Sequence, residues 1–140
     1  MVNFTKAISN EHMINGLQRL LHANEAVITK CRSTELACRD DGLKKQLREL
    51  THLHESHIRM LTDSIHYLGG SAPDSEPPRK GGDWSASSGG TESAVLETEA
   101  EERKLREAYM EALKRLAASD EVVNVINQAL RELEQFPRLA

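Results

Sequence analysis

Polar side chains interrupt the apolar faces of three predicted helices, and their types could support metal chemistry. They are Glu25 in the first helix, His54 and His57 in the second, and Glu99 and Glu102 in the third. A lone charge in a protein core costs several kcal/mol, so buried carboxylates and imidazoles must pair or bind something. Imidazole and carboxylate ligands together suit iron, manganese or zinc, and their spacing does not choose among these metals. We therefore take these five residues as candidate metal ligands.

The first two helices place one acid and one histidine at the same height. Counted from the turn at Asp41, Glu25 lies 16 residues back and His57 lies 16 residues forward. At a rise of about 1.5 Å per residue, both lie about 24 Å from the turn. The sequence therefore predicts that Glu25 and His57 face each other in the core.

A purely structural interpretation of the same residues stays open. The two histidines and three glutamates can form a buried network of hydrogen bonds and ion pairs, with Arg106 as the counter-charge. Catalytic residues are not assigned, because nucleophile–histidine patterns and a phosphate-binding glycine motif are absent from the sequence. Whether the chain is an enzyme is left undecided.

The elements that must position these residues are helices. Ala, Leu, Glu, Arg and Lys dominate the chain of 140 residues, and all of them favour helix. Apolar residues recur at the spacing of amphipathic helices, while runs typical of strands are missing. Ser119 or Asp120 can cap the last helix. The pattern predicts one domain, residues 1–140, built as an all-α bundle of four helices: Asn10–Arg39, Leu43–Leu68, Thr91–Ala118 and Asp120–Phe136.

The segment at about residues 69–90 decides the predicted topology. It is rich in glycine and contains three of the four prolines, so it cannot be regular helix. At up to about 3.3 Å per residue it can run back along the second helix. We therefore predict one long crossover that makes the second and third helices parallel, with Trp84 pinning it to the bundle. A disordered linker is the alternative.

Two stretches resemble the ferritin-like superfamily. His54-Glu55-Ser56-His57, followed by Leu68-Gly69-Gly70-Ser71-Ala72-Pro73, is similar to the end of the second helix in bacterioferritins and rubrerythrin-like relatives. Glu99 and Glu102, followed by Tyr109-Met110-Glu111-Ala112-Leu113, resemble a short bacterial ferritin-like family of unknown function. The resemblance implies metal ligands at Glu25, His54, His57 and Glu99 or Glu102.

The resemblance implies a ferritin-like protein with an incomplete di-metal site. A full di-iron site takes a Glu-x-x-His pair from two helices. Here the second helix has His-x-x-His, and the fourth helix has apolar residues at its inward positions. The expected function is iron binding or oxidation, or a role in stress. The alternative is a non-enzymatic bundle that acts through self-association or a partner, with a relic polar core.

Composition narrows the class of protein further. A formal charge of −4 argues against a nucleic-acid partner, and no apolar run is long enough for a membrane span. Cys31 and Cys38 are too far apart on one helix to pair, which indicates reduced thiols and a cytoplasmic location. The broad apolar face of the fourth helix favours a homodimer.

Overall fold

The computed structural model describes residues 4–71, 90–116 and 119–139, with side chains from residue 10 onward in the first range and from residue 91 in the second. Within these ranges the chain forms four helices and no strand. The prediction of an all-α chain is confirmed. The helices are α1 (Phe4–Ala37), α2 (Asp41–Tyr67), α3 (Gly90–Arg115) and α4 (Asp120–Gln135), and none of them combines the length and apolar character needed to cross a membrane.

Local sequence explains where two of the helices start and where α2 ends. The Asp40 carboxylate caps α2 by accepting from the backbone N–H groups of Gly42 and Leu43, at 2.8 and 3.2 Å. The Ser119 hydroxyl caps α4, as predicted, through the N–H of Val122 at 3.4 Å. At the end of α2, Gly69 has φ +91°, and the N–H of Gly70 bonds the carbonyl of Ile65. Only glycine adopts this conformation readily, so the Gly-Gly pair closes the helix.

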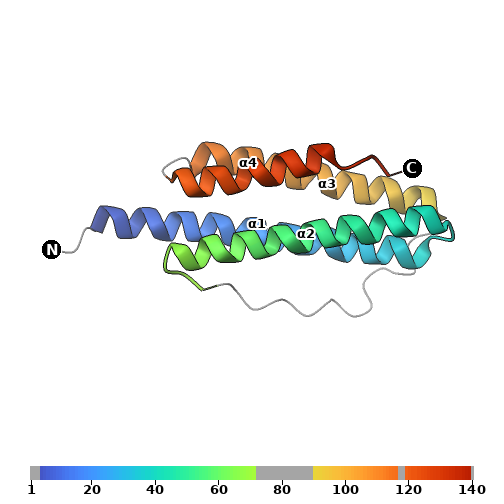
Figure 1. Ribbon diagram of the computed structural model, residues 1–140, viewed down its shortest axis with the longest axis horizontal. Helices are drawn as coiled ribbons and strands as arrows, with labels where there is room; N and C mark the ends of the chain where they lie inside the picture. Colours follow the sequence, from blue (N-terminus) through green and yellow to red (C-terminus); the bar gives the residue numbers. More distant parts are fainter. Residues whose placement is uncertain (1–3, 72–89, 117–118, 140) are drawn as a thin grey trace.

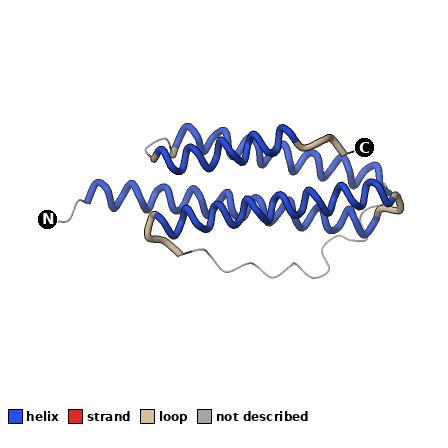
Figure 2. The backbone as a smooth tube through the Cα atoms, in the orientation of Figure 1, coloured by secondary structure: helices blue, strands red, loops and turns tan. Residues whose placement is uncertain are grey.

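The four helices form two antiparallel pairs around one core (Figures 1 and 2). Helix α1 packs against α2 and α3, and α4 packs against the same two helices. Figure 1 shows α2 and α3 running in the same direction. The contacts of α1 agree: Asn24 bonds Tyr109, whereas Thr34, further along α1, bonds Thr98, which is earlier in α3. Helix α1 is therefore antiparallel to α3, as it is to α2. The prediction that these two helices are parallel is confirmed. Trp84 and most of the predicted crossover lie outside the described residues.

The core follows the apolar stripes of the four helices with one exception. Full burial of each leucine or isoleucine stabilises the fold by about 1.5–3 kcal/mol. Leu36, an apolar residue of the α1 pattern, is instead 75% exposed near the end of that helix. The apolar face of α4 is largely covered within the chain itself. Apolar residues of the four helical patterns that are buried include Leu17, Leu21, Ile28, Leu43, Leu47, Leu50, Leu61, Ile65, Tyr109, Leu116, Val122, Ile126, Ala129 and Leu133.

Candidate metal centre

His54 and His57 lie at the centre of the bundle, as predicted. Both side chains are fully buried, and their rings meet edge to face with centroids 5.9 Å apart. The two residues are three apart on α2, so they share one helix face and point toward α3 and α4. Together with their carboxylate partners, Glu102 and Glu132, they form what we call the histidine–carboxylate cluster.

Each imidazole has one carboxylate partner from a different helix. His54 Nε2 contacts Glu102 Oε1 of α3, and His57 Nε2 lies 2.9 Å from Glu132 Oε1 of α4. The Glu102 side chain is 14% exposed and that of Glu132 is 36% exposed. The cluster therefore joins three helices and opens toward solvent on its carboxylate side.

The prediction that α4 has only apolar side chains facing the core is wrong, because Glu132 reaches it. On the helix, Glu132 lies about 100° from Leu133, at the edge of the apolar stripe beside Val125. A long side chain at such an edge can extend across to the next helix. In the sequence, the feature that could have indicated Glu132 is its position as an acid beside the apolar stripe of α4.

Asn24 is the second residue that the sequence reasoning missed, and it occupies the position expected for Glu25. It is fully buried, with His54 Nδ1 2.9 Å from its Oδ1. Leu17, Asn24, Cys31 and Cys38 recur at intervals of seven, and all four are buried. This spacing of seven residues is the sequence feature that could have indicated the burial of Asn24.

Glu25 lies at the edge of the α1 stripe rather than opposite His57. Its side chain is 22% exposed, and His22 Nδ1 lies 3.7 Å from its carboxylate. Glu25 Oε1 is nevertheless buried and has no hydrogen-bond partner among the described residues. Glu99 stays half-buried and faces a pocket shared with Glu102 and Arg106. The structure therefore brings His54, His57 and Glu102 together, and leaves Glu25 and Glu99 outside the cluster.

Hydrogen bonds of Asn24 define the tautomer of His54. Asn24 Nδ2 donates to the backbone carbonyl of Leu20 and to the Tyr109 hydroxyl, each at 2.8 Å. A carbonyl only accepts, so the amide orientation is unambiguous and Oδ1 must face His54. Nδ1 of His54 therefore carries the hydrogen, and in the neutral ring Nε2 has a lone pair.

That lone pair points at a carboxylate oxygen, which is also only an acceptor when ionised. Two acceptors in contact repel each other, and His54 is fully buried, so water does not screen the ring. The contact becomes favourable when a proton on either residue makes it a hydrogen bond, or when both atoms bind a metal ion instead.

His57 has a related imbalance at its other nitrogen. Burial lowers the pKa of His57 from its ordinary value of 6.5, outweighing the hydrogen bond to Glu132, which raises it. The neutral ring donates Nε2–H to Glu132, and Nδ1 is then a buried lone pair with no partner among the described residues. Burial also raises the pKa of the Tyr109 hydroxyl above its usual range, so the ring that faces His57 is uncharged.

Cys31 lies beside the cluster but adds no negative charge to it. Burial, followed by repulsion from Glu102, raises the pKa of the Cys31 thiol to about 12. The thiol is therefore protonated at neutral pH. Cys31 and Cys38 are both free, as predicted, and both are buried.

The lowered pKa of His57 predicts a loss of stability in acid. The unfolded chain binds a proton at His57 below about pH 6.5, while the folded chain resists it, so unfolding takes up protons. In metal-free protein, the free energy of unfolding should fall from pH 6.5 downward by up to about 1.4 kcal/mol per pH unit. Urea titrations across this range measure it.

Matched variants isolate the contribution of His57. His57→Gln should flatten the acid slope, while His52→Gln, at an exposed position of the same helix, should leave it unchanged. An acid slope equal in wild type and His57→Gln would contradict the assignment.

The ligand types in the cluster suit a transition metal, but too few side chains converge to surround one metal ion. Imidazole nitrogen and carboxylate oxygen are ligands of iron, manganese and zinc. In the described ranges, however, no three His, Cys, Asp or Glu side chains converge as the ligands of one metal ion. Tight structural sites use about four protein ligands, so a metal here would keep positions for water.

Comparisons with known proteins add no relatives. No family model matches the chain, and neither a curated protein nor a solved structure is significantly similar to it.

Proposed function

We propose that this chain is a ferritin-like bundle that binds a divalent first-row transition metal at the histidine–carboxylate cluster. The supporting observation is the contact between His54 Nε2 and the Glu102 carboxylate, two metal-ligand types that meet in the core. His54 and Glu102 would bind the metal directly, and His57 and Glu132 would supply further ligands once their side chains turn toward it. Asn24 would orient the His54 ring from behind, as outer-shell partners of metal-bound histidines do.

The order and direction of the helices support the ferritin-like part of the proposal. Helices α1 and α2 are antiparallel and α2 and α3 are parallel (Figure 1), and the side chains of His54 and His57 are buried in the core. Bundles with one crossover share this arrangement. The free, buried cysteines are consistent with a reducing cytoplasm.

Open coordination positions give the proposed site a chemical role. Reactive metal sites keep such positions, while structural sites close them. Bound iron or manganese would supply redox and Lewis-acid chemistry, which supports iron binding or oxidation as the function. The half-exposed Glu132 gives the cluster access to solvent.

A second candidate is a non-enzymatic bundle in which a proton replaces the metal. Two observations favour this candidate: each imidazole has its own carboxylate, and among the residues that the structure describes no third ligand converges on either pair. In this case the polar core defines the packing of the helices, and the chain acts by self-association. Leu96 and Met110, both exposed and 14 residues apart, lie on one face of α3, where a second copy can pack.

Metal analysis of untagged protein distinguishes the two candidates. The protein is dialysed separately against Mn(II), against Zn(II) and, under anaerobic conditions, against Fe(II). Bound metal is then measured by mass spectrometry. We expect at least one equivalent of one metal to be retained. At about 100 times the dissociation constant, binding adds about 2.7 kcal/mol and raises the melting temperature by about 5–10 °C.

A chelator provides the control for this experiment. It should return the melting temperature of the metal-loaded protein to that of the metal-free protein. Protein that retains none of the three metals, with melting that is insensitive to metal and chelator, would reject the metal proposal and favour the second candidate.

A further inference from the structure

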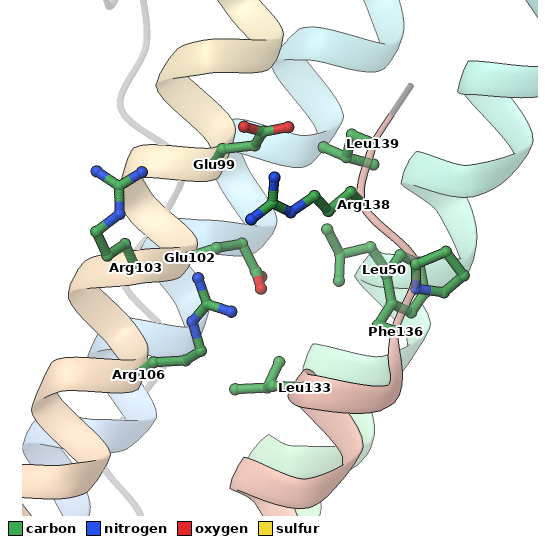
Figure 3. A pocket seen from close by; sticks show the side chains of 10 residues that line it. Leu50, Glu99, Glu102, Arg103, Arg106, Leu133, Phe136, Arg138 and Leu139 are labelled. Atoms are coloured by element: carbon green, nitrogen blue, oxygen red, sulfur yellow. The ribbon is translucent and has the colours of Figure 1, made fainter.

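A pocket of about 180 Å³ lies beside the cluster, between α3 and the segment that follows α4 (Figure 3). Three arginines line it: Arg103 and Arg106 from α3, and Arg138 from the C-terminal segment. In Figure 3, Arg106 and Arg138 extend into the space between the two elements, and Arg103 lies at its edge. Two independent parts of the chain thus direct positive charge to one place.

These arginines lack the ion pairs that usually compensate such a group. Over the ranges that the structure describes, none of the three guanidinium groups pairs with a carboxylate, although Lys30, Arg32 and Arg115 elsewhere do. Glu99 and Glu102 also line the pocket, but one Glu102 oxygen already contacts His54. The pocket wall therefore has an excess of positive charge over negative charge.

Apart from Arg138, the pocket wall that faces α3 is apolar. It consists of five side chains, namely Leu50, Leu133, Phe136, Pro137 and Leu139. The backbone carbonyl of Arg138 accepts a hydrogen bond from Gln46 Nε2 at 2.9 Å, which ties the C-terminal segment to α2. Arg138 is thus held over the pocket by its own backbone, so little of its backbone freedom remains to be lost on binding.

We propose that this pocket binds a small organic carboxylate with an apolar body. Guanidinium groups match the two oxygens of a carboxylate, and the leucine and phenylalanine side chains match the rest of such a ligand. Clefts that hold drug-sized ligands measure about 300–1,000 Å³, so the smaller volume limits the ligand to about one ring or a short chain. The proposal shares Glu102 with the metal cluster but does not depend on bound metal.

Benzoate is the probe for this proposal, and calorimetry on the full chain measures its binding with and without chelator. A ligand of about nine non-hydrogen atoms should bind with a dissociation constant on the order of 0.1–1 mM. Benzamide has the same ring without charge, and inorganic phosphate has charge without an apolar body. Both should bind at least about tenfold more weakly, because each lacks one of the two features.

Variants test the roles of the individual side chains. Arg106→Gln and Arg138→Gln should each weaken benzoate binding by about tenfold, and Arg138 lies beyond the last helix, so its change does not threaten folding. Arg59→Gln, an exposed arginine of α2, should have no effect. Glu99→Gln should strengthen binding, because it removes a repelling carboxylate from the wall.

Two results would overturn the proposal. One is an absence of benzoate binding at millimolar concentration. The other is equal binding by the Arg106→Gln, Arg138→Gln and Arg59→Gln variants. Phosphate binding as tight as that of benzoate would reject the apolar part of the ligand class.

Discussion

Replacing Asn24 with leucine should lower the free energy of unfolding by about 3–5 kcal/mol. The two side chains have the same branching and the same number of non-hydrogen atoms, so the change chiefly removes hydrogen bonds. It leaves the Nδ1–H group of His54 without its acceptor and the Tyr109 hydroxyl without its donor. Both residues are fully buried, so water cannot replace the lost bonds. Thermal melting should show a decrease of about 10 °C.

Two further variants show whether the lost bonds are the cause. Asn15→Leu, at an exposed position of the same helix, should change stability by less than about 0.5 kcal/mol. Adding Tyr109→Phe to Asn24→Leu should recover part of the loss, because it removes the hydroxyl that has no donor. Strictly additive effects of the two changes would show that Asn24 and Tyr109 do not act through their mutual bond.

Replacing Glu102 with glutamine should weaken metal binding by at least about 100-fold while leaving metal-free protein as stable as wild type or more so. Loss of a carboxylate ligand lowers affinity, because an amide carries no charge. In metal-free protein, however, the new Nε2–H group of the glutamine can donate to the lone pair of His54 Nε2. The repulsion between two acceptors is then absent.

A series of the same glutamate-to-glutamine change identifies the ligands. Glu102→Gln and Glu132→Gln should weaken metal binding most, measured by competition with a coloured chelator. Glu25→Gln and Glu99→Gln should have smaller effects, since the structure places both outside the cluster. A larger effect of Glu25→Gln than of Glu132→Gln would favour the ligand set inferred from the sequence, with Glu25 opposite His57. Equal affinity in all four variants would show that no metal binds at this cluster.

Much of the local structure follows from the sequence alone. Helix boundaries agree within a few residues at most ends, because Asp40, Ser119 and Gly69 act on the backbone directly beside them. The burial of His54 and His57 also follows, since both lie within the leucine stripe of α2. These are interactions over one or two helical turns, and a periodic sequence contains them.

Only the tertiary structure decided which side chains meet. In a straight helix, residues seven apart differ in direction around the axis by about 20°. Over the 34 residues of α1 this drift accumulates, so the apolar pattern does not decide whether Asn24 or its neighbour Glu25 faces the core. The pairing of His57 with Glu132 depends on the rotation and height of α4 against α2, which neither helix encodes by itself. The arginine pocket depends on where the chain goes after α4, because Arg138 joins Arg106 across 32 residues of sequence. A predicted contact between two helices contains the error in the rotation and height of each helix. A shift of one residue in either helix brings a different side chain into the contact.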